Sequence, residues 1–132
     1  MNRLTGTIKK VQRAGAINRI VTDCNGVALT CVTLDLADCF KEGSEVAVVF
    51  KETEVALAKG RDLAISISNL LACTVFSIDE GALLSEVGLT FDGVRFISII
   101  TTDSLKRLDI KEGEEVTALI KANEVSIEEV TP

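Results

Sequence analysis

Short apolar runs recur along the chain at a spacing of about ten residues, which is typical of strands joined by tight turns. The first half contains the runs 7–11, 17–22, 27–33, 45–50 and 55–58, and the second half contains the runs 73–78, 83–89, 94–100, 115–120 and 125–128. Asn25-Gly26 and Asp92-Gly93 separate the second and third runs of each half, and such pairs favour two-residue hairpin turns. The pattern predicts five strands in each half.

The two halves are copies of one unit. Residues 43–55 and 113–125 carry Gly, Glu, Val, Lys, Glu and Val at matching steps, and each copy opens with an Asn, at Asn2 and Asn69. A duplication of this kind predicts two similar domains, for which we set the bounds 1–60 and 66–132. Residues 59–68 are the linker candidate. Units this small bury too little surface to be stable alone, so we expect them to pack on each other or on other chains.

One stretch in each copy breaks the two-residue period of the strands. It lies between the third and fourth runs, at 33–40 and at 101–108, and Leu105 and Leu108 are three residues apart behind Thr and Asp capping candidates. That spacing predicts a short helix. Five strands with a helix between the third and fourth indicate an all-β protein with two tandem OB-type barrels, each with a short helix.

Several strands are apolar on both faces, notably Val46–Phe50 and Phe96–Ile100. A barrel surrounded by water alternates more cleanly, so the second face is expected to meet another barrel. A sandwich of the two copies within one chain is the alternative.

Composition removes several classes of function. The 132 residues include 14 Lys and Arg against 20 Asp and Glu, a net charge of −6 that repels nucleic acid, and there is no His. No apolar run reaches membrane-spanning length, and the N-terminus lacks the layout of a secretory signal, so we expect a cytoplasmic protein without membrane insertion. The cysteines Cys24, Cys31, Cys39 and Cys73 form no Cys-x-x-Cys pair and are interpreted as buried thiols, with no metal site.

Four sequence elements occur twice in the same order. The opening is Ser66-Ile67-Ser68-Asn69 in the second copy and Asn2 in the first; the hairpins are Gly15-Ala16-Ile17-Asn18-Arg19-Ile20-Val21 and Gly81-Ala82-Leu83-Leu84-Ser85-Glu86-Val87; a Thr precedes each helical stretch; and the last strands carry Lys51-Glu52-Thr53-Glu54-Val55 and Lys121-Ala122-Asn123-Glu124-Val125. On these elements, residues 2–57 and 69–127 each resemble the molybdate-binding barrel called Mop or TOBE. The tandem resembles the di-domain molbindins, which implies a homotrimer.

The chemistry of such a site follows from the ligand. Molybdate and tungstate offer only acceptor oxygens, so their site needs N–H, hydroxyl, amide and ammonium donors. Lys51 and Lys121 end apolar strands, where an ammonium is partly desolvated, although a solvated strand-end Lys is the competing interpretation. The Ser and Asn of the opening can donate, or can be ordinary linker residues. The Thr residues can help to hold an anion, or can simply cap the helix.

The resemblance implies an oxyanion-binding role for a set of residues in each copy. In the second copy they are Ser66, Ser68, Asn69, Ala82, Thr101, Thr102, Lys121 and Asn123, and in the first they are Asn2, Ala16, Thr33, Lys51 and Thr53. The family's opening Arg is replaced by Ser68 in the second copy and by Met1 in the first. Since a hydroxyl lacks the fixed charge of a guanidinium, affinity or ion preference can differ, and the first copy can be degenerate.

We therefore expect a protein that stores, buffers or senses molybdate or tungstate without an organic cofactor and without catalysis. Sulfate is a third tetrahedral ion that the sequence does not separate reliably from these two. The alternative is a TOBE module that docks to a transporter ATPase or another protein and binds no anion. An enzyme ranks third, because the chain offers no His, no nucleophile motif and no phosphate loop.

Overall fold

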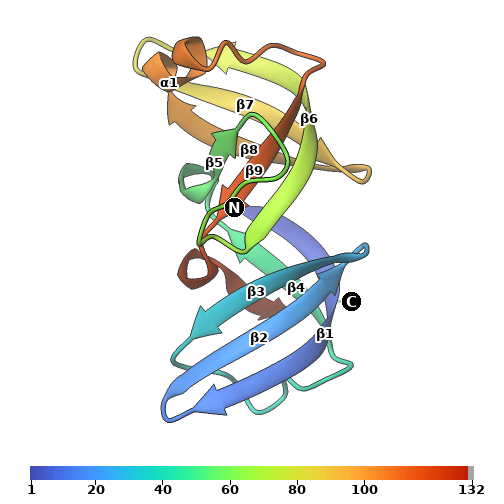
Figure 1. Ribbon diagram of the computed structural model, residues 1–132. Helices are drawn as coiled ribbons and strands as arrows, with labels where there is room; N and C mark the ends of the chain where they lie inside the picture. Colours follow the sequence, from blue (N-terminus) through green and yellow to red (C-terminus); the bar gives the residue numbers. More distant parts are fainter. Residues whose placement is uncertain (131–132) are drawn as a thin grey trace.

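The computed structural model describes residues 1–130 and consists of two five-stranded antiparallel sheets stacked end to end (Figure 1). The first repeat contributes β1 (Asn2–Ala14), β2 (Ile17–Cys24), β3 (Val27–Thr33), β4 (Glu45–Phe50), the 3-10 helix η1 (Glu52–Glu54) and β5 (Ala56–Ala58). The second contributes β6 (Asn69–Glu80), β7 (Leu84–Phe91), β8 (Val94–Thr101), α1 (Thr102–Arg107), β9 (Glu115–Ile120), the 3-10 helix η2 (Ala122–Glu124) and β10 (Ser126–Glu129). The all-β prediction with two tandem five-stranded barrels is confirmed.

The last strands are exchanged between the repeats. The first sheet has the order β10-β4-β1-β2-β3 and the second has the order β5-β9-β6-β7-β8. Thus β10 of the second repeat pairs with β4, while β5 of the first repeat pairs with β9. The sequence reading did not anticipate this exchange, because β4 and β9 have nearly the same pattern and both edges suit either last strand. The bounds 1–60 and 66–132 stay a prediction about the repeats, since each sheet contains strands of both.

The hairpin turns follow the sequence signals. Asn25 and Gly26 have φ angles of 51° and 87°, and Asp92 and Gly93 have φ angles of 46° and 81°. Two successive positive φ angles define the tight turn whose twist matches the flanking strands, and Asn, Asp and Gly reach that region at the lowest cost. The predicted hairpins β2–β3 and β7–β8 are confirmed by their ladders.

The short helix forms only in the second repeat, within the described residues 1–130. Thr101 caps α1 by accepting a hydrogen bond from the Ser104 backbone N–H at 3.1 Å, and Leu105 is buried. In the first repeat, residues 34–44 form turns and irregular loop, so the helix expected there is absent. The ladders place Leu34 where Thr101 stands, and a leucine cannot accept the capping bond.

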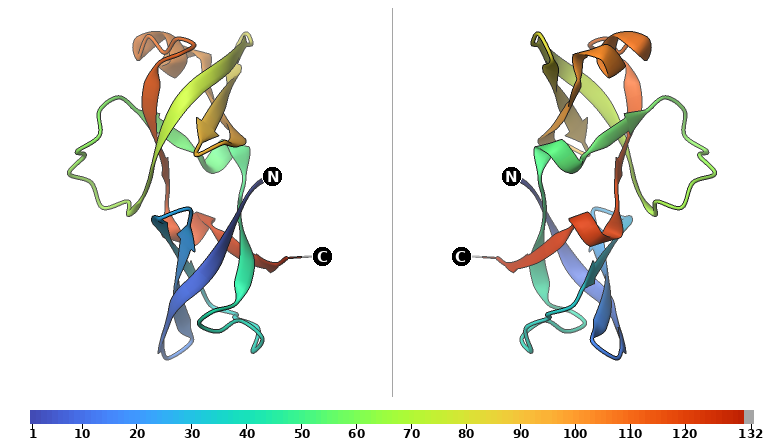
Figure 2. Two further views of the ribbon diagram at one scale, coloured as in Figure 1. Left: turned by 90° about the vertical axis from the view of Figure 1, so that its right-hand side faces the viewer. Right: turned by 90° about the vertical axis from the view of Figure 1, so that its left-hand side faces the viewer.

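The two sheets meet at a junction that we call the waist. It consists of the starts of β1 and β6, the ends of β4 and β9, and the two crossing segments Lys51–Val55 and Lys121–Val125, which contain η1 and η2 (Figures 1 and 2). Figure 2 also shows the loop between β5 and β6 arching away from the waist. No helix among residues 1–130 is both long and apolar enough to cross a bilayer.

One hydrophobic core runs through both sheets and the waist. Every residue of β4 from Val46 to Phe50 is buried within the single chain, and Phe50 packs edge-to-face on Phe96 of β8 with ring centroids 5.6 Å apart. Both faces of β4 are therefore buried within one chain, but the two copies stack end to end and do not form the sandwich given as the alternative. An oligomer is therefore not needed to cover that strand.

Candidate functional site

A cavity of about 350 Å³ opens at the waist and gathers half of the residues predicted for the second repeat's site. Its lining comprises Val32, Ser66, Ile67, Ser68, Lys121, Ala122 and Asn123. We call it the waist pocket. Four residues predicted from the sequence, Ser66, Ser68, Lys121 and Asn123, are thus brought together.

The strand ladder explains why these segments converge. Asn69 pairs with Ile120 across β6 and β9, so Ser68, just before Asn69, and Lys121, just after Ile120, are neighbours at the same end of the ladder. The Asn69 side chain then binds the backbone of β3, which brings the edge of the first sheet to the same place. The pocket is therefore built from both repeats.

The charge of the waist pocket suits an anion. Among the described residues 1–130, Lys121 is the one charged residue that lines it, and no carboxylate of that part of the chain does. Within residues 1–130, the Lys121 ammonium makes no ion pair with a described carboxylate. Together with the hydroxyls of Ser66 and Ser68 and the amide of Asn123, it forms a set of donors for a ligand that only accepts hydrogen bonds.

Val32 adds a donor that sequence reasoning missed. Asn69 bonds both the N–H and the C=O of Thr30, at 2.7 and 2.8 Å, so the peptide group of Thr30 points away from β2. Alternate residues of an antiparallel strand direct their peptide groups to the same edge, so the Val32 N–H points to that edge also. Val32 lines the pocket. The sequence alone carries no signal for this donor, because only the sheet order shows that β3 is an edge strand.

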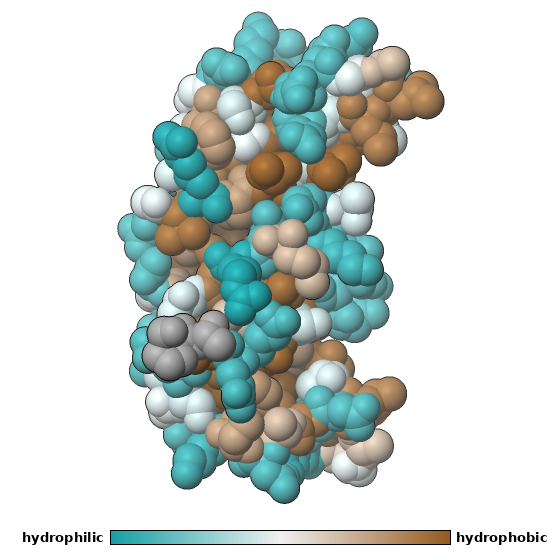
Figure 3. Space-filling model, turned by 180° about the vertical axis from the view of Figure 1, so that it is seen from behind, coloured by the Kyte–Doolittle hydropathy of each residue, from teal (hydrophilic) through white to brown (hydrophobic). Residues whose placement is uncertain are grey.

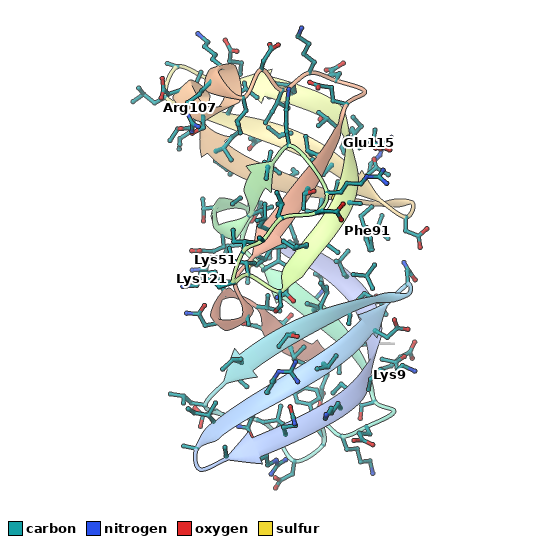
Figure 4. The ribbon with its side chains drawn as sticks, in the orientation of Figure 1. Lys9, Lys51, Phe91, Arg107, Glu115 and Lys121 are labelled. Carbon is teal, nitrogen blue, oxygen red and sulfur yellow. The ribbon has the colours of Figure 1, made fainter. Side chains whose placement is uncertain are left out.

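The corresponding region around Lys51 is lined differently. A smaller cavity of about 130 Å³ contains Lys51 together with Glu54 and Glu124, and Asn123 lies between this cavity and the waist pocket, lining both. Figure 4 shows Lys51 and Lys121 at the waist. Two carboxylates around one ammonium oppose the binding of a dianion. The first repeat's site is thus electrostatically poorer than the second.

The N-terminus adds to this difference. The Met1 ammonium donates to Glu52 Oε2 at 3.1 Å. A backbone hydrogen bond at Glu52, followed by the bond from the N-terminal ammonium, keeps the pKa of the Glu52 carboxyl below its ordinary value. Met1 stands where the second repeat has Ser68, and its positive charge is already engaged with an acid.

Asn2 and Asn69 serve the architecture of the waist. Asn69 is fully buried, and both ends of its amide are bonded to Thr30. Asn2 does the same to Ile97, with its Nδ2 donating to the carbonyl at 2.7 Å and its Oδ1 accepting from the N–H at 3.0 Å. Both amides are engaged with the main chain, so their contribution to a ligand site is to hold its walls in place.

The remaining predicted residues lie elsewhere. Ala16 and Ala82 occupy the tips of the hairpins β1–β2 and β6–β7, at the far ends of strands of 13 and 12 residues that begin at the waist. Strands of this length span about 35 to 40 Å. Thr102 is buried beside Ala82 and donates to the Gly81 carbonyl at 2.8 Å. Neither tip reaches the waist pocket of its own chain.

Three further threonines are also outside the waist pocket. Thr101 caps α1, which is the alternative to anion binding given above for this residue. Thr33 donates from its hydroxyl to the Asp35 carbonyl at 3.3 Å. Thr53 lines a separate cavity between β5 and β8.

The cysteines follow the sequence interpretation with one exception. Cys24, Cys31 and Cys73 are buried, and burial raises the pKa of Cys31 to about 11 and that of Cys73 to about 12, which keeps these thiols protonated and unreactive. Cys39 is exposed, contrary to the expectation of buried thiols, because the loop that replaces the first-repeat helix leaves it on the surface.

Fold and pocket define a tandem-barrel binding protein with a donor-lined cavity between its barrels. The TOBE domain family matches residues 65–127. Molybdenum-pterin-binding protein 1 of Clostridium pasteurianum is 39% identical over 66 residues, which cover 49% of this chain and 97% of that protein. Molybdenum-pterin-binding protein MopB of Rhodobacter capsulatus is 39% identical over 85 residues, which cover 63% of this chain and 32% of that protein.

A solved structure matches nearly the whole chain. The cytoplasmic molybdate-binding protein ModG, crystallised with molybdate bound, superimposes with a TM-score of 0.87 at 27% identity, covering 98% of this chain and 96% of that one. The chain belongs to the family of Mop molybdenum-pterin-binding proteins built from tandem TOBE domains.

Proposed function

We propose that this protein binds molybdate or tungstate in the cytoplasm and stores, buffers or senses the ion without chemical turnover. The observation that carries the proposal is the waist pocket, which is lined by Lys121 and several neutral donors and by no carboxylate of the described residues. Several charge-assisted hydrogen bonds of about 1.5 to 3 kcal/mol each suffice for micromolar binding, about −8 kcal/mol, after the cost of association.

The relatives support the same ligand class. The matched proteins are described as molybdenum-pterin-binding or molybdate-binding. Molybdate and tungstate are both tetrahedral dianions, so one donor set serves either of them. Sulfate is expected to bind more weakly, and no organic cofactor is required by the pocket's donor set.

The assembly is proposed to be a homotrimer in which a neighbouring chain closes the site. Leu34, Leu83 and Leu84 are 68%, 82% and 57% exposed, and Ile17 is 51% exposed. These residues sit at or beside the two hairpin tips, which lie at opposite ends of one side of the molecule (Figure 1). Figure 3 shows apolar surface at both ends of that side, with a recess between them. Exposed apolar tips of this kind favour burial against another chain.

Such a contact would also give Ala16 and Ala82 a role. Their tips lie too far from the waist pocket of their own chain, but a tip of a second chain can reach it and present its backbone N–H groups. The small alanine side chains permit this close approach. The homotrimer is the arrangement that the likeness to tandem molbindins implies.

The test is isothermal titration of the purified protein with molybdate, tungstate and sulfate in one buffer, combined with light scattering. We expect micromolar or tighter binding of molybdate or tungstate, weaker binding of sulfate, and a particle three times the 14.1 kDa chain. Flat titrations with both metal oxyanions at millimolar concentration would remove the proposal and favour a docking module. A stable monomer would remove the trimer.

A further inference from the structure

A second and larger cavity lies on the second sheet and has no part in the proposed oxyanion site. It is an open cavity of about 650 Å³ between β5, β8 and α1, and it shares no lining residue with the waist pocket. Cavities of about 300 to 1,000 Å³ are the usual size of small-molecule sites in proteins. The volume is far more than a tetrahedral ion requires.

The inner surface of this cavity is apolar. Val55 and Leu57 come from the crossing segment and β5, Ile99 from β8, and Leu108 from the residue after α1. These side chains come from two strand edges that are not paired with each other. The apolar part of a small organic molecule is the kind of ligand that such walls accommodate.

Three charged residues line the cavity. Lys59 and Arg107 are cations, and Glu54 is an anion. Lys59 is engaged, because its ammonium lies 3.2 Å from Glu114 and donates to the Asp109 carbonyl at 2.9 Å. Arg107 is the remaining cation.

The Arg107 guanidinium is positioned but not neutralised. It donates to the Ser104 hydroxyl at 3.0 Å, and that hydroxyl also accepts from Thr101. No ion pair joins Arg107 to a carboxylate among residues 1–130. Figure 4 shows Arg107 at the helix end of the second sheet, away from Lys51 and Lys121. A guanidinium held by one hydroxyl retains free donors for a carboxylate or phosphate.

We infer that the cavity between β5, β8 and α1 binds a small organic acid, with its apolar body between Leu57, Ile99 and Leu108 and its acidic group on Arg107. The wall formed by α1 is particular to the second repeat, since the first has a loop in its place. The protein would thus carry an organic-anion site in addition to the oxyanion site.

The experiment uses two probes that differ only in charge, 2-naphthoate and its uncharged amide, 2-naphthamide. Titration of the full-length protein by calorimetry or NMR should show the acid binding roughly tenfold or more tightly than the amide, since one charge-assisted bond to Arg107 separates them. Arg107→Ala should abolish this difference by weakening the acid alone. Arg107→Lys should retain part of it, because a single ammonium lacks the guanidinium fork.

Lys106→Ala is the matched control. Lys106 is the neighbouring exposed cation, 4.0 Å from Glu80, and does not line the cavity, so its removal should change neither affinity. Equal affinities of the wild-type protein for acid and amide would overturn the inference. So would an equal loss of naphthoate affinity in Lys106→Ala and Arg107→Ala, or no binding of either probe at millimolar concentration. The outcome is independent of the oxyanion site, because Lys121→Ala and saturating molybdate should leave the naphthoate titration unchanged.

Discussion

The two crossing segments, Lys51–Val55 and Lys121–Val125, have the same backbone course but different surroundings. Each leaves the end of a central strand through a lysine, makes one 3-10 turn and enters the opposite sheet. Each is anchored by a donor at the same position of the receiving sheet: Ser98 donates to the Val55 carbonyl at 2.7 Å, and the Cys31 thiol donates to the Val125 carbonyl at 2.9 Å.

The difference lies in what faces each lysine. Lys121 shares its pocket with two serines and an asparagine, whereas Lys51 shares its cavity with two glutamates. The fold is thus duplicated, but the chemistry is not. Duplication fixes where a site can form, and the side chains around the lysine decide whether an anion is bound there.

The largest expected effect concerns the asparagines that hold the waist. Asn69→Ala would leave two buried peptide groups of Thr30 without partners, at a cost of about 2 to 5 kcal/mol in the free energy of unfolding. Asn2→Ala should cost less, about 1 to 3 kcal/mol, because Asn2 is 6% exposed and water can reach Ile97 more easily. Urea denaturation of both variants measures the difference. Equal losses would mean that the two halves of the waist are equally buried.

The next effect separates the two lysines by ligand binding. Lys121→Ala should weaken molybdate binding by about 2 to 3 kcal/mol, or roughly thirty- to a hundredfold, because the anion loses its one formal positive partner. Lys51→Ala should change affinity by less than about threefold, because its region already contains two carboxylates. Both residues are exposed, so folding should persist in each variant. A strong loss with Lys51→Ala alone would reverse our ranking of the repeats.

The third effect tests the anchors of the crossing segments. Ser98→Ala would leave the buried Val55 carbonyl unbonded and should reduce the free energy of unfolding by about 1 to 2 kcal/mol. Ser98→Cys reproduces the arrangement at Cys31 and should cost less, because a thiol is a weak donor but still occupies the site. Thermal unfolding of the two variants is the measurement. If Ser98→Cys loses as much stability as Ser98→Ala, a bond from a thiol to the Val55 carbonyl does not stabilise the segment Lys51–Val55.

The local sequence pattern correctly predicted the hairpin turns and the second-repeat helix, which depend on residues close together in the chain. The hairpin pairs Asn25-Gly26 and Asp92-Gly93 are confirmed because positive φ angles demand such residues. The helix at 102–107 is confirmed because Thr101 can cap it, and the first-repeat helix is absent because Leu34 cannot. That absence could have been predicted if the ladder register, which aligns Leu34 with Thr101, had been known.

Which strands pair with each other at the waist could not be predicted from local pattern. The sequence does not state whether Ala56–Ala58 pairs with β4 of its own repeat or with β9 of the other, because both edges carry the same pattern. The position of Val32 was also missed, because it depends on β3 being an edge strand and on the Asn69 contact with Thr30. The proximity of Ser66, Ser68 and Lys121 could be predicted, because these residues lie next to the start of one strand and the end of another. These two strand ends, Asn69 and Ile120, are paired in the structure.

The smallest expected effect is a gain of binding in the first repeat. If the carboxylates of Glu54 and Glu124 are what oppose an anion near Lys51, the double variant Glu54→Gln, Glu124→Gln should strengthen binding there by about 0.5 to 1 kcal/mol, or roughly two- to fivefold, as expected for partly solvated charges. The gain should fall as salt is raised, because screening weakens exposed charges first. Glu112→Gln, an exposed change of the same charge outside both waist cavities, is the control and should leave affinity unchanged. The test is titration with molybdate in the Lys121→Ala background, where binding at the second repeat is already weak. No gain, or an equal gain from the control, would show that features other than these two carboxylates limit that site.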